Sequence, residues 1–212
     1  MKFKICLILI FLFSLFSNSV RTYALLDDLY LENIQNEMKD DFEFQQNGVR
    51  SVYRVNAEKQ DVIKNTKCTL EANFKEDVIE KNDEINIRTS LKDIQVKFFS
   101  NNNQTIVYFT IINYNKEIII SNLMKELTEL QGKNIFDIRY FQYIKGKINN
   151  IDDRLKKIES LHQINNIDTL DIHSGYVGRA NLNNGERVNI ALNSYDTGNY
   201  LVIGTPVIFV TY

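Results

Sequence analysis

The chain has 212 residues, of which 25 are basic and 27 acidic, so that its formal charge is −2. This length is enough for one domain, or for two small ones that share an interface, with a core that needs no disulfide. A slightly acidic chain has no general attraction for phosphate backbones, which argues against nucleic acid as a partner.

Residues 1–24 have the layout of a secretory signal peptide. Two lysines precede an apolar run of 12 residues over 5–16, and modest or small side chains follow at Thr22 and Ala24. The run is shorter than the roughly 20 residues that cross a bilayer. We predict cleavage after Ala24, only transient contact with the membrane, and a secreted or surface-associated product. The alternative is an uncleaved signal that anchors the chain in the membrane.

Removal of 1–24 changes both the charge and the cysteine content. This segment holds three basic residues and no acid, so the formal charge falls from −2 to −5. Cys6 leaves with it, and Cys68 then has no partner for an intramolecular disulfide. Cys68 lies off the apolar stripe of its predicted helix. We expect it to be partly exposed and incidental, the alternative being a reactive or intermolecularly paired thiol.

The spacing of apolar residues predicts a leading helix within 25–41 and a first α+β unit over 42–115. The unit opens with a strand over 42–55, in which Asn47 and Gly48 indicate a hairpin turn or a bulge. A helical period follows over 57–74. Three further strands are predicted, at 85–91, 94–99 and 105–114.

A helix within 116–133 links this unit to a second one over 134–212. Asn115 is the predicted cap of the linking helix, and Gly132 stands where a glycine ends a helix. The order of elements then repeats. A long strand ends at Gly146, and Asn149 or Asn150 opens a helix. Three more strands are predicted, at 167–177, 187–193 and 200–211.

Each unit therefore consists of a strand, a helix and three strands. This order predicts an α+β fold with an internal duplication, in which antiparallel sheets, or one continuous sheet, carry the helices on one face. The alternative is a single irregular α+β domain whose order of elements repeats by accident.

The most distinctive sequence lies near the end of the chain. The strand Val188–Leu192 reads VNIAL, and Gly204-Thr205-Pro206 precedes a final Tyr212. Upstream stands Ser174-Gly175-Tyr176. These segments resemble the YwmB-like family of exported proteins from Gram-positive bacteria.

The resemblance implies a fold like that of the TATA-box-binding protein, a twisted and duplicated α+β saddle, and it implies no established activity. Asn193 stands where the family usually has an arginine, which puts a role for that cation in doubt. The matching positions are expected to be structural: Ser174, Gly175, Tyr176, Asn189, Gly204, Thr205, Pro206 and Tyr212.

No pattern typical of catalysis or metal binding stands out. His162 and His173 lie on different predicted elements, without further ligands at metal-site spacing. Glycine-rich phosphate loops and nucleophile elbows are lacking. The adjacent carboxylates Asp40-Asp41 and Asp152-Asp153 are typical of helix ends, and the lack of tryptophan disfavours sugar stacking. We therefore expect no catalytic, cofactor-binding or metal-binding residue and no cofactor.

These observations favour a non-enzymatic protein of the cell envelope or the extracellular space. It is expected to bind a protein or another envelope component through its sheet, and no nucleic acid. Aromatic residues in the predicted strands are mostly core, the alternative being an aromatic binding face. A cell-wall-acting hydrolase with a diffuse carboxylate site is the alternative function, and an oligomeric structural subunit is a third.

Overall fold

The computed structural model describes residues 31–34, 36 and 42–210. The predicted signal peptide, Asp40-Asp41 and Tyr212 lie outside the described residues. Of the predicted leading helix, 31–34 and 36 are described, and they are helical.

Over residues 42–210, ten strands and three longer helices follow in chain order. They are β1 (Glu43–Val55), α2 (Lys59–Asn73), β2 (Ile79–Lys81), β3 (Glu84–Arg88), β4 (Lys92–Asn101), β5 (Gln104–Asn113), α3 (Ile120–Leu130), β6 (Ile135–Ile148), α4 (Ile151–Glu159), β7 (Ile164–Ile172), β8 (Gly175–Leu182), β9 (Arg187–Tyr195) and β10 (Gly198–Thr205).

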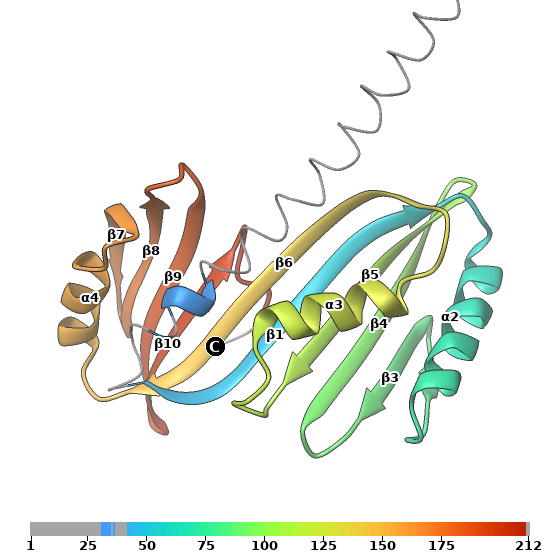
Figure 1. The fold of residues 1–212 in the computed structure, drawn as a ribbon, viewed down its shortest axis with the longest axis horizontal. Helices are drawn as coiled ribbons and strands as arrows, with labels where there is room; N and C mark the ends of the chain where they lie inside the picture. The colour runs from blue at the N-terminus through green and yellow to red at the C-terminus, as the bar shows by residue number, and fades with distance from the viewer. Residues whose placement is uncertain (1–30, 35, 37–41, 211–212) are drawn as a thin grey trace, which may run out of the picture.

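All ten strands belong to one twisted sheet with the order β2-β3-β4-β5-β1-β6-β10-β9-β8-β7 (Figure 1). Every neighbouring pair is antiparallel. The longest strands, β1 and β6, pair at the centre. Strands β2 to β5 lie beyond β1 on one side of this central pair, and β7 to β10 lie beyond β6 on the other. The predicted α+β class and antiparallel pairing are confirmed.

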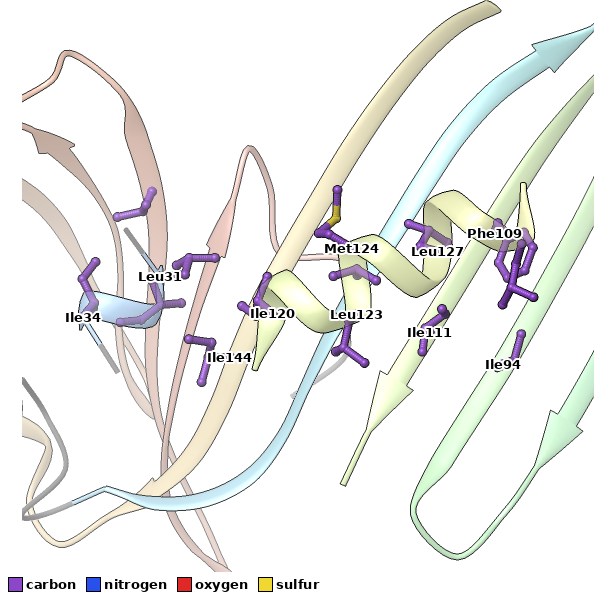
Figure 2. Packing of buried hydrophobic residues seen from close by; sticks show 14 of the residues in the cluster. Leu31, Ile34, Ile94, Phe109, Ile111, Ile120, Leu123, Met124, Leu127 and Ile144 are labelled. Carbon is purple, nitrogen blue, oxygen red and sulfur yellow. The ribbon is translucent and has the colours of Figure 1, made fainter. Parts of the chain in front are cut away.

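Alternation along the strands gives the sheet one core face. Val49, Phe109 and Ile111 of the first half are fully buried, as are Leu192 and Leu201 of the second. Helix α3 packs on β1 and β5, α2 on β4 and β5, and α4 on β7 and β9. Figure 2 shows Leu123 and Leu127 of α3 beside Phe109 and Ile111 of β5. Leu31 and Ile34 continue this core beyond Ile120 and Ile144.

Several predicted details are wrong. After its helix each half has four strands instead of three. The sequence does not predict the short β2, because all three of its residues are exposed and leave no periodic pattern. The single strand predicted over 167–177 is a hairpin, β7 and β8, which turns at His173 and Ser174. A strand over 200–211 is also too long, since β10 ends at Thr205.

The turn or bulge predicted at Asn47-Gly48 and the helix cap predicted at Asn115 are also wrong. Strand β1 runs straight through Asn47-Gly48, and its register shifts against β6 lie elsewhere. Helix α3 begins after Ile119, while the Asn115 side chain accepts a hydrogen bond from the Glu117 amide. The Ser121 amide instead donates to Glu32, 2.8 Å away, on the leading helix.

The cap of α4 is as predicted, since the Asn150 side chain accepts a hydrogen bond from the Asp153 amide at 3.0 Å. None of the helices in the described part of the chain is long and apolar enough to cross a membrane.

Candidate functional site

The face of the sheet opposite the helices is the candidate site. Register and alternation place its residues: Arg50 of β1 lies opposite Thr110 of β5 and Phe141 of β6. None of the described helices packs on this side, and we call it the uncovered face.

One row of paired residues crosses the uncovered face from β3 to β7. Each member lies directly opposite the next on the neighbouring strand. Arg88 and Arg179 stand near its two ends, and Gly48, Tyr143 and Gly204 lie at its centre. In order, the row is Arg88, Asp93, Ile112, Gly48, Tyr143, Gly204, Asn189, Arg179 and Asp168.

Arginine is concentrated on this face. Of the seven arginines that the structure describes, only Arg154, which is buried on α4, lies elsewhere. The other six are Arg50, Arg54, Arg88, Arg139, Arg179 and Arg187. Strand register also places Lys81, Lys97, Lys145 and Lys147 here. The uncovered face is therefore basic although the whole chain is slightly acidic.

Few of these cations are neutralised by neighbouring carboxylates. Arg54 pairs with Asp137 at 3.1 Å and Lys97 with Glu84 at 3.4 Å. Within the described parts of the chain, the other arginines and lysines of this face have no carboxylate within ion-pair distance. They remain available to an anionic ligand.

The larger concentration of charge lies in a shallow groove of about 720 Å³ over β3, β4, β5, β1 and β6, which we call the first groove. Arg50, Arg88, Lys97 and Lys145 line it, together with a single acid, Asp93. Amide side chains from the same strands complete its polar lining: Gln46, Asn86 and Gln95.

Arg50 is the best fixed cation of the first groove. Its Nε donates to the Thr110 hydroxyl at 2.8 Å, and its guanidinium carbon lies 4.4 Å from the centre of the Phe209 ring. Burial lowers the pKa of the Arg50 guanidinium below its ordinary value. The guanidinium is thus a held, partly desolvated positive charge without a carboxylate partner among the described residues.

A second groove of about 730 Å³ lies over β7, β8 and β9. Arg179 and Arg187 supply its cations and Asp168 its acid. Three asparagines supply the neutral amides of this groove: Asn166, Asn181 and Asn189. The two grooves therefore share a combination of arginine and neutral amides.

Residues 206–210, which we call the cover segment, lie on the uncovered face after β10, and Phe209 and Val210 form one border of the first groove. The Phe209 ring meets Tyr143 edge-on, with ring centres 5.0 Å apart, and Phe141 at 6.4 Å. Tyr143 is fully buried, and burial raises the pKa of its phenol. Its hydroxyl accepts a hydrogen bond from Gln46 at 2.9 Å.

The structure brings four of the predicted motif positions together where the cover segment begins. The Asn189 amide donates to the Pro206 carbonyl, and the Thr205 hydroxyl donates to that of Arg187 at 3.2 Å. The Thr205–Pro206 peptide is cis. A Cβ on Gly204 would lie 3.0 Å from the Gln142 carbonyl oxygen and 3.1 Å from Ile208. This corner joins β9, β10 and the cover segment.

The other motif positions lie apart from that corner. Ser174 lies in the β7–β8 turn and Gly175 begins β8, and the Ser174 carbonyl accepts a hydrogen bond from the Ser194 amide at 2.7 Å. Gly175 has φ of 148°, and a Cβ there would lie 1.9 Å from the Leu192 carbonyl oxygen. Tyr176 faces α4, and its hydrogen bond to Asp152, 2.9 Å long, raises the pKa of the phenol.

The remaining candidates are scattered. His162 and His173 are exposed in turns, so the predicted helix and strand positions of these residues are wrong. Cys68 is exposed, as predicted. Asp152 and Asp153 lie in the first turn of α4. Over the residues that the structure describes, no group of three or more histidine, cysteine or acidic side chains could hold a metal ion.

Sequence reasoning missed the basic face because it considered the charges along the chain. Lys92, for example, is in β4 but faces α3, where it pairs with Glu126 at 2.6 Å. One sequence signal could have located the face. Along each predicted strand, the arginines alternate with the buried apolar residues and so point to the face opposite the core.

Comparison of the chain with models of protein families and with curated proteins finds no match.

Proposed function

We propose that the chain is a YwmB-like protein with a duplicated fold like that of the TATA-box-binding protein. The strand order supports this. Outward from the centre, the first half runs β1-β5-β4-β3-β2 and the second β6-β10-β9-β8-β7. A helix follows the first strand of each half, α2 after β1 and α4 after β6. The repeated unit would then be a strand, a helix and four strands.

We further propose that the protein is exported and acts without catalysis, by binding a partner on the uncovered face. The observation that carries this proposal is a ten-stranded sheet with all its described helices on one side and most of its arginines on the other. Exposed Phe99 and Tyr108, whose rings are 5.2 Å apart, add apolar surface at one end. Exposed aromatic and arginine side chains are typical of interfaces.

Export and the expected absence of a nucleic-acid partner rest on the signal-like residues 1–24. The formal charge of the chain by itself does not exclude nucleic acid, because the cations gather on one face. The expected absence of a nucleic-acid partner therefore depends on export of the protein to a compartment with little nucleic acid, and on the shape of the uncovered face.

Site-specific crosslinking in cells that express the full chain tests the proposal. A photoreactive phenylalanine analogue replaces Phe99 or Tyr195, which are exposed on the uncovered face. Matched controls carry it at Lys64 of α2 or Lys125 of α3, which are exposed on the helices. We expect adducts outside the cytoplasm from the first pair only. Adducts only from the helix positions, or only in the cytoplasm, would contradict the proposal.

A further inference from the structure

The choice of arginine over lysine narrows the chemistry of the partner. In the described chain, the helices and their flanks carry most of the lysines, whereas all arginines but Arg154 lie on the uncovered face. The planar guanidinium matches phosphate and carboxylate groups with two parallel hydrogen bonds, and it is more weakly hydrated than an ammonium group. An anion with forked oxygens fits this face.

The spread of the cations indicates a polymer. Arg88 and Arg179 belong to the same row, on β3 and β8, with six strands between them. At about 4.8 Å per strand, they are roughly 34 Å apart along the sheet. A small anion reaches one groove only, whereas a long chain with repeated charges contacts both.

The amides of the first groove indicate that the polymer also carries hydroxyl groups. Asn86 and Gln95 donate to Glu84, at 2.9 and 2.7 Å, and Gln46 donates to Tyr143. Within the described structure, the oxygens of these three amides accept no side-chain hydrogen bond. Amide oxygens are acceptors and need donors, which polyol hydroxyls supply and acidic polypeptide side chains do not.

The cover segment disfavours a rigid duplex. Phe209 rests on Tyr143 at the centre of the row and borders the first groove on the side of the second one. A rod laid across both grooves would meet this segment, whereas a thin, flexible chain can pass beside it along Lys145 and Lys147 of β6. These lysines lie over the Tyr200 ring, 5.2 and 5.9 Å from its centre.

We propose that the two grooves bind a flexible, hydroxyl-bearing phosphodiester polymer of the polyol-phosphate type. Its phosphates contact the arginines, its hydroxyls contact the amides, and one chain engages both grooves. This inference rests on the proposed function and names the class of the partner.

Calorimetry or fluorescence anisotropy with the chain lacking residues 1–24 tests the inference. Poly(glycerol phosphate) is compared with glycerol 3-phosphate, polyglutamate, and single-stranded and duplex DNA at about 0.15 M salt. We expect the polymer to bind at least about tenfold more tightly than the other ligands, because linked sites act together. Its affinity should fall as salt rises.

Two charge-matched variants locate the site. Arg88→Gln and Arg179→Gln together remove one exposed arginine from each groove, whereas Lys64→Gln and Lys125→Gln remove two exposed charges from the helices. An exposed ion pair contributes at most about fivefold. The arginine variant should therefore bind the polymer about 10- to 25-fold more weakly, with the helix variant within about twofold of wild type. Circular dichroism melts confirm that both fold.

Each alternative result overturns the inference. Polyglutamate binding as tightly as the polymer would assign the face to acidic proteins, and tighter DNA binding would assign it to nucleic acid. Equal losses in both variants would place the polymer elsewhere. If nothing binds while crosslinks from Phe99 and Tyr195 persist, the polymer is wrong but the proposed function stands. If the polymer does not bind and the crosslinks from Phe99 and Tyr195 are also absent, both the polymer ligand and the proposed function are wrong.

Discussion

The Asn113 side chain donates a hydrogen bond to Asn47 across the β1–β5 pair, with 2.8 Å between Nδ2 and Oδ1 and both residues fully buried. Asn47 donates in turn to the Ile118 carbonyl at 2.8 Å, and Asn113 to that of Asn115 at 2.7 Å. This polar group in the core fixes the loop that leads from β5 into α3.

Replacement of Asn113 by alanine should lower the free energy of unfolding by about 2–3 kcal/mol, because it leaves buried polar groups of Asn47 and the loop without partners. Urea denaturation followed by circular dichroism measures this change. Asn103→Ala, in an exposed turn, is the control and should leave the midpoint unchanged. Equal midpoints for the two variants would show that the asparagine pair does not hold the loop.

Gly48 makes room for the Tyr143 ring. A Cβ at Gly48 would lie 2.5 Å from Tyr143 Cε1 and 2.8 Å from the Ile111 carbonyl oxygen. Because the backbone oxygen cannot move aside, Gly48→Ala should cost about 1–3 kcal/mol. Gly132→Ala is the matched control, since a Cβ there meets nothing within 4 Å. Thermal melts of both variants provide the comparison, and a stable Gly48→Ala protein would contradict the packing described.

Gly204 has the equivalent place on the other side of Tyr143, under the cover segment. Gly204→Val should destabilise the fold by about 1–3 kcal/mol, because its side chain would meet Gln142 and Ile208. The melting temperature tests this expectation. A variant that melts like wild type but binds no partner would instead make the corner a functional element.

The cover segment keeps Tyr143 out of water. Burial raises the pKa of Tyr143, so the phenol stays protonated above the pH at which an exposed tyrosine ionises, near 10. Phe209→Ala should uncover the ring and lower this pKa toward the ordinary value, with a loss of about 1–2 kcal/mol of stability. Ultraviolet absorbance during an alkaline titration reports the change. Val207→Ala, at an exposed position, should titrate like wild type.

Export is tested on the secreted protein itself. Mass spectrometry should find an amino terminus at Leu25, as expected for cleavage after Ala24. An intact Met1 terminus, or protein found only in the membrane, would show that residues 1–24 act as an anchor.

The sequence by itself determined most of the strands and helices, because apolar periodicity is a local property. Residues 57–74 show a helical period and 105–114 read as a buried strand, and both elements form close to these limits. Exposed β2 and the β7–β8 turn were missed because neither has a buried stripe to reveal it. The α+β class follows from the order of elements.

Only the tertiary structure decided where the charges meet. Arg88 and Arg179 are 91 positions apart in the chain, yet they share a row because β1 pairs with β6 in the register that places Gly48 opposite Tyr143. A shift of that register by one residue would send every side chain of a strand to the other face. Alternation within a strand can assign each arginine to one face of that strand, but only pairing between distant strands gathers these faces into one basic surface.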